Sequence, residues 1–333
     1  MKLLIVTGAY PPMVGGSAYY AKNIYRELSP VEEVSLLYYK LEKKLPTGIR
    51  HLLFFFRTLA RAINTEQILA LDTFSSGLPA VFAAKILGKK ITVRVGGDFL
   101  WEQYIERTGD LVPLPYFYGQ KEKNFTIREK VIYKLTKILF QLADKIIFNS
   151  PWQKNISQKA YDIPSKKIAI LENVILERDF QSEPKEKTFF CAARDIKLKN
   201  LKALRNSFAV VQKDNPQALL CAGQMSFEKM LAEIKVAYAV ILISVSDISP
   251  DLISQAIQYG KPFIVTKYNG LPEEIQNLGV LVDPKNQQEI QKSIQQMLEK
   301  EFYDQKCKEI RAYTKIRSWQ DLSEDILKIL KNA

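Results

Sequence analysis

The chain has 333 residues, a length that suits two domains of ordinary size. Its 47% hydrophobic and 25% charged residues are typical of a globular protein and exclude a disordered one. No apolar run approaches the ~18 residues of a membrane-spanning helix. The net charge of +12 indicates an anionic partner, but it does not distinguish nucleic acid, anionic lipid and phosphate-bearing small molecules.

Three cysteines, at positions 191, 221 and 307, form no CxxC pair. Such a sparse, odd-numbered set predicts neither a disulfide framework nor a zinc site, and buried free thiols in a reducing cytoplasm are the simplest interpretation. The apolar start of the chain is followed at once by Pro11-Pro12 and Gly15-Gly16, without a small-residue cleavage site. We therefore expect a first buried strand there and not a signal peptide.

The first half of the chain alternates apolar runs with amphipathic segments. Strands are expected at 3–7, 33–39, 67–71, 90–95 and 145–148, and helices at 17–28, 52–63, 79–87, 126–143 and from Pro151 onward. The stretch between 98 and 126 is expected to be irregular. Strands that alternate with helices predict a parallel, doubly wound sheet.

A second alternating series follows the charged stretch 177–187, which contains Pro184 and is the expected linker. Its strands are expected at 188–192, 218–222, 239–244 and 261–266, and its helices at 201–212, 226–234, 249–259 and over most of 287–330. Two such units predict a crevice at the carboxyl ends of their strands. The loops expected to line it are 10–16, 96–98, 194–199, 247–250 and 269–273.

The loop from Tyr10 to Gly16 joins the first strand to the first helix. Gly15 and Gly16 allow backbone to approach a ligand, and the start of the helix offers free N–H groups to an anion. A tight strand-to-helix turn explains the two glycines equally well. The motif is not GxGxxG, so a dinucleotide site is not indicated.

Residues 5–12, IVTGAYPP, with Gly15-Gly16 and a helix behind them, resemble the opening of retaining GT-B glycosyltransferases of the GT4 family. Arg194 and Lys199, five residues apart after a strand, are similar to the family's Arg…Lys pair, which grips the donor diphosphate. A forked guanidinium and a point ammonium neutralise charge that grows on a leaving pyrophosphate. A solvated basic loop is the alternative interpretation.

The strongest local match is QAIQYGKP at 255–262 with NGLPE at 269–273, which resembles the family's helix, Gly-Lys-Pro turn, strand and Gly-x-Pro-Glu loop. The resemblance implies donor-binding roles for Gly15, Gly16, Gln255, Asn269, Gly270 and Glu273. Ser318-Trp319 before a final helix also resembles the family, whose last helix crosses back onto the first domain. The stretch 218–244 looks about one β-α unit short, so the second domain is expected to be small.

The chain departs from the family at its two glutamates, where it has Asp247 and Gln255. The resemblance implies that Asp247 faces the donor sugar on a shorter arm and that Gln255 bonds the ribose hydroxyls without charge assistance. Pro250 removes a backbone donor, and Asp251 adds negative charge near the expected phosphates. These departures bear on donor affinity and on activity.

The single histidine, His51, is expected at the surface or in packing, and Gly96-Gly97-Asp98 stand where the family often has a histidine. We therefore expect a front-face mechanism in which the leaving phosphate takes the acceptor proton while Arg194, Lys199 and Asp247 form the catalytic set. Gly97 and Asp98 are assigned to acceptor binding, and a turn or capping carboxylate is the equal alternative for Asp98. No metal is expected, and the nucleotide diphosphate sugar is a co-substrate with no further cofactor.

Two helices carry much of the positive charge. The helix 126–143 places Ile127, Val131, Leu135, Ile138 and Leu142 on one face among Arg128, Lys130, Lys134 and Lys137, and the helix 52–63 carries Phe54, Phe55 and Phe56 between Arg50, Arg57 and Arg61. Contact with an anionic membrane and a lipid-linked acceptor is one interpretation. A buried core face with a solvated basic face is the other. No nucleic-acid-binding signature is present, so no nucleic-acid partner is expected.

The resemblance implies an α/β GT-B fold in which two Rossmann-like domains face each other across a cleft. The expected parts are an acceptor-binding domain over 1–177, a shortened nucleotide-sugar-binding domain over 178–315 and a helix over 316–333 that packs back on the first domain. The implied function is retaining transfer of a hexose-type sugar to a hydroxyl acceptor in polysaccharide, glycolipid or cell-envelope glycan synthesis, in the cytoplasm or on the inner membrane face. A degenerate GT-B protein that binds nucleotide sugar or glycan without turnover is the alternative. A third interpretation, a nucleotide-sugar 2-epimerase, is disfavoured by the single histidine.

Overall fold

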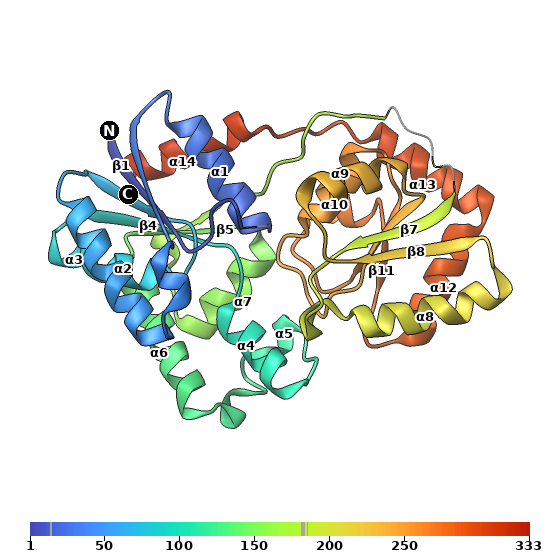
Figure 1. Ribbon diagram of the computed structural model, residues 1–333, viewed down its shortest axis with the longest axis horizontal. Coiled ribbons are helices and arrows are strands. Elements are labelled where there is room, and N and C mark those ends of the chain that lie inside the picture. Colours follow the sequence, from blue (N-terminus) through green and yellow to red (C-terminus); the bar gives the residue numbers. More distant parts are fainter. Residues whose placement is uncertain (14, 181–183, 185) are drawn as a thin grey trace. The chain divides into compact units, whose positions relative to one another are not determined.

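The structure, a computed structural model, describes residues 1–13, 15–180, 184 and 186–333, and the chain divides into two compact units (Figure 1). The first unit contains residues 1–101, 118–172 and 319–333, and the second contains 102–117 and 173–318. The sequence places 102–117 in the first domain, whereas these residues lie in the second unit. The expected linker 177–187 includes positions 181–183 and 185, which lie outside the described residues.

The first unit is built on a parallel sheet whose described strands follow the order β2-β1-β3-β4-β5-β6. The strands are β1 (Lys2–Thr7), β2 (Glu33–Tyr38), β3 (Gln67–Ala70), β4 (Lys90–Val95), β5 (Lys145–Phe148) and β6 (Ile168–Ile170). β1 pairs with β2 from Lys2 opposite Glu33, and with β3 from Leu3 opposite Gln67. The central strands are apolar runs buried on both faces, as expected for a parallel sheet covered by helices.

Helices cover this first sheet, and several begin at clear capping signals. They are α1 (Gly16–Leu28), α2 (Thr47–Ala62), α3 (Gly77–Ile86), α6 (Ile127–Leu142), α7 (Pro151–Tyr161) and α14 (Trp319–Lys331). Thr126 and Glu129 form a reciprocal capping box at α6, and Ser150 caps α7 ahead of Pro151. α14 packs against α1, where the ring of Trp319 meets Tyr20 edge-on.

The second unit has a parallel sheet of five described strands in the order β11-β10-β9-β7-β8, one strand fewer than the first. The strands are β7 (Lys187–Ala192), β8 (Ala218–Gly223), β9 (Ala239–Leu242), β10 (Phe263–Thr266) and β11 (Val280–Val282). The helices are α8 (Leu201–Asp214), α9 (Phe227–Val236), α10 (Asp251–Gln258), α11 (Glu273–Gln276), α12 (Gln287–Leu298) and α13 (Lys300–Ala312). The core between them is mostly aliphatic and contains aromatic contacts such as that of Phe189 with Phe208.

Three local expectations need correction. The stretch expected to be irregular contains α4 (Phe99–Thr108) and α5 (Leu114–Phe117). α6 buries Ile132, Leu139 and Phe140, whereas Ile127 is 84% exposed on the face that the sequence pattern offered as its apolar side. Of the three cysteines only Cys191 is buried, and the other two are half-buried.

Candidate functional site

The switch point of the second sheet lies between β7 and β9, because the chain continues from β7 to β8 on one side and from β9 to β10 and β11 on the other. Loops that follow the carboxyl ends of two such strands diverge, and open α/β sheets bind their ligands there. Arg194 and Lys199 follow β7, and Asp247 follows β9. The three residues predicted to be catalytic therefore stand on the two loops that flank this switch point.

Lys199 and Asp247 form an ion pair across this point. Lys199 Nζ donates to Asp247 Oδ2 at 2.7 Å, and the two side chains are 21% and 12% exposed. Burial lowers the pKa of Lys199, but attraction to Asp247 and the hydrogen bond to it, with a smaller effect of Glu102, outweigh burial and raise that pKa above its ordinary value. Lys199 is therefore a fixed positive charge at physiological pH.

The backbone of Asp247 is fastened to the loop after β10. Its N–H donates to Tyr268 O at 3.0 Å, and its carbonyl accepts the Gly270 N–H at 3.1 Å. Asn269 is buried, where its amide donates to Thr266 O and its side-chain oxygen accepts the Leu271 N–H. Asn269 and Gly270 thus shape the loop that holds Asp247.

Arg194 is exposed, and no ion pair holds its guanidinium within the described part of the chain. Its carbonyl accepts the Ile196 N–H at 2.9 Å, at the start of a tight turn that leads into the short helix Lys197–Lys199. The loop therefore presents one exposed cation and one cation held by an ion pair. A guanidinium and an ammonium together have the chemistry to hold a diphosphate.

The segment 102–117 adds an acidic contact to the same loop, and no motif in the sequence indicates this contact. Glu106 Oε1 accepts the Leu198 N–H at 3.1 Å, and the Glu106 carbonyl accepts from Lys197 Nζ at 2.7 Å. Leu114 N–H donates to Ser246 Oγ at 3.0 Å, next to Asp247. A carboxylate thus occupies a backbone N–H of the loop predicted to receive the donor phosphates.

Helix α10 carries Gln255, the residue predicted to hold the ribose. Gln255 Oε1 is buried and makes no hydrogen bond within the described residues. A buried acceptor without a donor is costly, so this oxygen is ready to receive a hydroxyl group. At the start of the same helix Pro250 is the N-cap residue, and Asp251 Oδ1 accepts from Asn173 Nδ2 at 3.0 Å.

Glu273, predicted on the donor side, is the exposed first residue of the four-residue helix α11. In the first unit, Gly15 is the N-cap of α1 and Gly16 its first residue. Gly15 has φ +142, a conformation that favours glycine, and open space where a Cβ would stand. The strand-to-helix turn therefore accounts for Gly15, and the adjacent N–H groups of α1 stay a predicted anion site.

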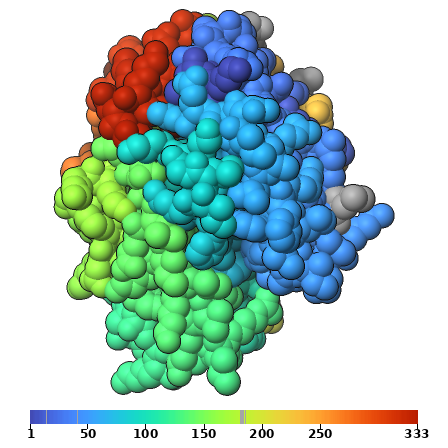
Figure 2. All heavy atoms as spheres, turned by 90° about the vertical axis from the view of Figure 1, so that its left-hand side faces the viewer, coloured from blue at the N-terminus to red at the C-terminus, as the bar shows by residue number. Residues whose placement is uncertain are grey.

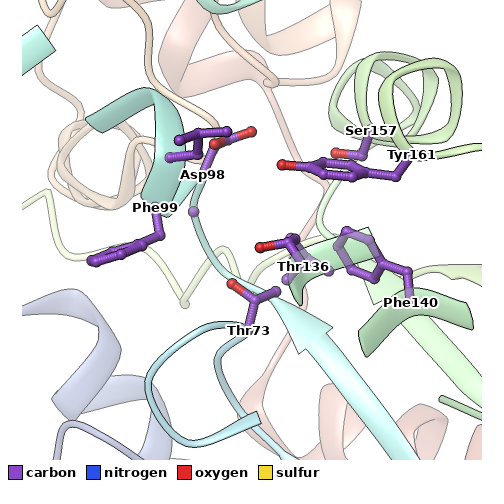
Figure 3. Close-up of a pocket in the computed structure, with 10 residues that line it drawn as sticks. Thr73, Asp98, Phe99, Thr136, Phe140, Ser157 and Tyr161 are labelled. Carbon is purple, nitrogen blue, oxygen red and sulfur yellow. The ribbon is translucent and has the colours of Figure 1, made fainter. Parts of the chain in front are cut away.

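Asp98, predicted to contact the acceptor, lines a pocket at the end of β4 (Figure 3). Asp98 Oδ1 accepts the Trp101 N–H at 3.0 Å and so caps α4, and Oδ2 accepts the Tyr118 hydroxyl at 2.7 Å. Tyr118 and Tyr161 share a further hydrogen bond of 2.7 Å. Burial raises the pKa of Asp98, although its hydrogen bonds from Trp101 and Tyr118 act in the opposite direction.

The pocket itself is polar on several sides. Figure 3 shows the hydroxyl groups of Thr73, Thr136 and Tyr161 turned toward its interior, below Asp98 and Ser157. Gly97 lies in the same wall. Hydroxyl groups and a carboxylate are side chains that hydrogen-bond sugar hydroxyls, but both Asp98 oxygens already accept hydrogen bonds within the first unit, as a capping carboxylate does.

Two residues near the end of the first sheet carry no motif in the sequence. Asp72 accepts the Gly8 N–H at 2.8 Å and also bonds Ser75 and Ser76, so it ties together the loops after β1 and β3. Arg94 on β4 is buried, with its guanidinium 3.5 Å from the centre of the Tyr20 ring. Asp72 thus holds the loop that begins at Gly8, and Arg94 links β4 to α1 through the Tyr20 ring.

No cluster of three or more metal-ligating side chains occurs among the described residues. Within the same residues no helix has the length and apolar character needed to cross a membrane. His51 is half-buried, with Nε2 2.9 Å from Phe74 O and its ring edge-on to Phe74. It is a packing residue of the first unit.

Comparison with known proteins shows which proteins this chain resembles. Residues 223–317 match the family described as glycosyl transferases group 1. A sucrose-phosphate synthase from Thermosynechococcus elongatus superposes on 100% of this chain with 99% of its own, at a TM-score of 0.72 and 11% identity. The fold is GT-B.

Other solved structures share the GT-B fold. WaaG, a glycosyltransferase involved in lipopolysaccharide biosynthesis, covers 99% of this chain with 100% of its own, at a TM-score of 0.68 and 10% identity. A Methanocaldococcus jannaschii UDP-GlcNAc 2-epimerase covers 100% of both chains, at a TM-score of 0.59 and 13% identity. No curated protein sequence matches this chain. The resemblance to group 1 glycosyltransferases and the α/β GT-B fold class are confirmed, and together they support a transferase.

Proposed function

We propose that this protein is a retaining glycosyltransferase that moves a hexose-type sugar from a nucleotide diphosphate sugar to a hydroxyl acceptor. The group 1 match over residues 223–317 supports a transferase of this class. The observation that carries the proposal is the Lys199–Asp247 pair at the switch point of the second sheet, with Arg194 exposed on the same loop as Lys199. Cationic side chains on loops that diverge after the carboxyl ends of neighbouring strands form a site suited to a diphosphate.

The proposed reaction needs no resident cofactor. The bond between the anomeric carbon and the donor diphosphate breaks while the acceptor oxygen bonds the same face of that carbon, and the acceptor proton passes to the leaving phosphate. Arg194 and Lys199 stabilise the charge that the leaving diphosphate gains. Asp247 positions Lys199 and faces the donor sugar.

The remaining predicted residues take supporting roles in the proposal. Gln255 Oε1 accepts a ribose hydroxyl, which supplies the donor that this buried oxygen lacks. Glu273 belongs to the same proposed donor site of the second unit, and the N–H groups near Gly15 and Gly16 stay a predicted anion site of the first unit. The pocket beside Gly97 and Asp98 takes the acceptor, with hydroxyl-bearing side chains added to the residues predicted from sequence.

The biological setting belongs to the same proposal. We place the reaction in polysaccharide, glycolipid or cell-envelope glycan synthesis, with an acceptor linked to lipid. The protein then works in the cytoplasm, peripherally on the inner membrane face. The net charge of +12 supports an anionic surface as a partner.

A second candidate function is a degenerate GT-B protein that binds nucleotide sugar or glycan without turnover. Asp251 in the first turn of α10 favours it, because a carboxylate there uses the helix end that otherwise attracts phosphate. Glu106 on the Leu198 N–H acts in the same direction.

One experiment separates the two candidates. The protein is incubated with UDP-, GDP- and ADP-sugars, and nucleotide diphosphate release is measured beside equilibrium binding. We expect release with one donor and a loss of roughly 100-fold or more in Arg194→Ala. Lys202→Ala, a neighbouring exposed cation on α8, is the matched control and retains the activity. Tight binding without release selects the degenerate protein, and equal turnover in both variants refutes the phosphate site.

A further inference from the structure

Helix α2 exposes an apolar stripe that the core of the protein does not use. Ile49, Leu52, Phe56 and Ile63 are 56–58% exposed, and their spacing places them along one side of the helix. Phe54, Thr58 and Ala62 are buried on the opposite side. The exposed stripe is therefore a second apolar face and not the rim of the buried one.

Helix α6 also has an exposed apolar side that is separate from its buried side. Ile127, Val131 and Ile138 are exposed, while its buried side consists of other residues. α3 contacts both α2 and α6, so the two helices lie on the same side of the first sheet. Figure 2 looks onto this side, where the blue atoms of α2 and the green atoms of α6 both reach the surface. We call the exposed residues of these two helices the basic apolar face.

The charge on this face is of one sign. α2 contains no acidic residue, and the one acidic residue of α6, Glu129, is buried in the capping box. Arg61, Arg128, Lys130 and Lys134 are exposed, with no acidic partner among the described residues. They differ in this from Arg57, which pairs with Glu42, and from Lys137, which pairs with Asp162. On α6 the uncompensated cations thus flank the exposed apolar side chains, whereas Arg61 is near the end of α2 and away from its apolar stripe.

The structure assigns the basic apolar face to the surface of a bilayer that contains anionic phospholipid. The exposed apolar side chains enter the boundary between headgroups and acyl chains, and the exposed cations of the two helices meet lipid phosphates. A second copy of the chain fits poorly, because a two-fold contact would set the same unpaired cations against each other. Nucleic acid would use the cations but leave the apolar stripes without a partner.

This inference deepens the peripheral location proposed above and rests on it, but its test requires no transferase activity. The purified full-length protein is floated with vesicles of phosphatidylcholine mixed with phosphatidylglycerol, and with vesicles of phosphatidylcholine alone. We expect binding to the anionic vesicles that weakens as salt is added. Nucleotide release measured without vesicles tests the proposed transferase activity separately. Vesicle binding and transferase activity can therefore each fail without the other.

Variants of exposed residues test whether the basic apolar face is the surface that contacts the vesicle. Leu52→Gln with Phe56→Gln should weaken vesicle binding about tenfold or more, since two apolar side chains no longer enter the bilayer. Lys134→Gln should weaken it about fivefold. The control is Val210→Gln with Val236→Gln, two similarly exposed residues on α8 and α9 of the second unit, and it should bind as the unaltered protein does.

Three results overturn the inference. Equal vesicle binding by the Leu52→Gln, Phe56→Gln variant and the control would remove α2 from the contact. A dimer in light scattering that this variant converts to a monomer, with no vesicle binding by either, would assign the face to a second copy. Binding of duplex DNA that Lys134→Gln weakens, again without vesicle binding, would assign it to nucleic acid.

Discussion

Lys199 Nζ lies 2.7 Å from Asp247 Oδ2, so the loops that follow β7 and β9 are joined by a charge pair at the switch point of the second sheet. The resting site is therefore balanced in charge at Lys199, and Arg194 supplies the net positive charge that a diphosphate meets. When a donor binds, the Lys199 ammonium must share its hydrogen bonds between Asp247 and a phosphate oxygen. The affinity of the site then depends on the strength of this pair.

The ion pair should be energetically coupled. Lys199→Met leaves the Asp247 carboxylate mostly buried without its partner, and we expect the free energy of unfolding to fall by about 1–3 kcal/mol. Adding Asp247→Asn to that variant should recover most of the loss, because the amide carries no charge. Urea unfolding of the two single variants and the double variant measures the coupling. Additive effects would mean that the pair contributes nothing.

Gln255 should matter for binding and not for folding. Gln255→Leu removes a buried oxygen that has no hydrogen-bond donor, so stability should stay the same or rise. If that oxygen receives a ribose hydroxyl, the variant should bind nucleotide diphosphate about fivefold more weakly. It should also no longer distinguish the nucleotide from its 2′-deoxy analogue.

Calorimetric titration with both nucleotides tests this role of Gln255. Gln295→Leu, at an exposed position of α12, is the control. Discrimination against the deoxy analogue that survives in Gln255→Leu would show that another residue reads the ribose.

The sequence was most informative where local pattern and chain order decide the outcome. Apolar runs gave the parallel strands, and the carboxyl ends of those strands placed Lys199 and Asp247 on neighbouring loops. It was least informative where tertiary contacts decide. The contact of Glu106 with Leu198 joins positions far apart in the chain and has no motif. On α6 two helical faces are both apolar in part, and only packing decides that Ile132 is buried and Ile127 exposed.

Glu106 should restrain donor binding. Its carboxylate accepts the Leu198 N–H inside the loop that carries Arg194 and Lys199, so it adds negative charge where phosphates are proposed to bind. Glu106→Gln keeps an oxygen for that N–H and removes the charge. We expect nucleotide diphosphate to bind about threefold to fivefold more tightly, with the gain shrinking as salt rises.

The matched control for Glu106 is Glu228→Gln, which removes an exposed carboxylate from α9. Both variants carry the same change in net charge, so a long-range effect would appear in both. An equal gain in affinity for the two variants would contradict a local role of Glu106.

Asp98 should make stability depend on pH in a defined direction. Burial raises its pKa above the ordinary value of 3.8, so folding favours the protonated carboxyl. The sign follows from linkage: the stabilising contribution of this proton is complete below the ordinary pKa and is lost as pH rises through the raised, folded-state pKa. The hydrogen bonds from the Trp101 N–H and the Tyr118 hydroxyl act against this rise, because they favour the ionised carboxylate.

Two substitutions of Asp98 separate its charge from its hydrogen bonds. Asp98→Asn mimics the protonated form, so its stability relative to the unaltered protein should rise from acidic to neutral pH. Asp98→Ala should lose about 1–3 kcal/mol at every pH, since it removes the cap and leaves Tyr118 without its acceptor. Asp214→Asn, at an exposed end of α8, is the control for charge alone. Urea unfolding from acidic to neutral pH measures the free energy of unfolding of each variant. Parallel pH curves of this free energy for Asp98→Asn and the unaltered protein would refute the raised pKa.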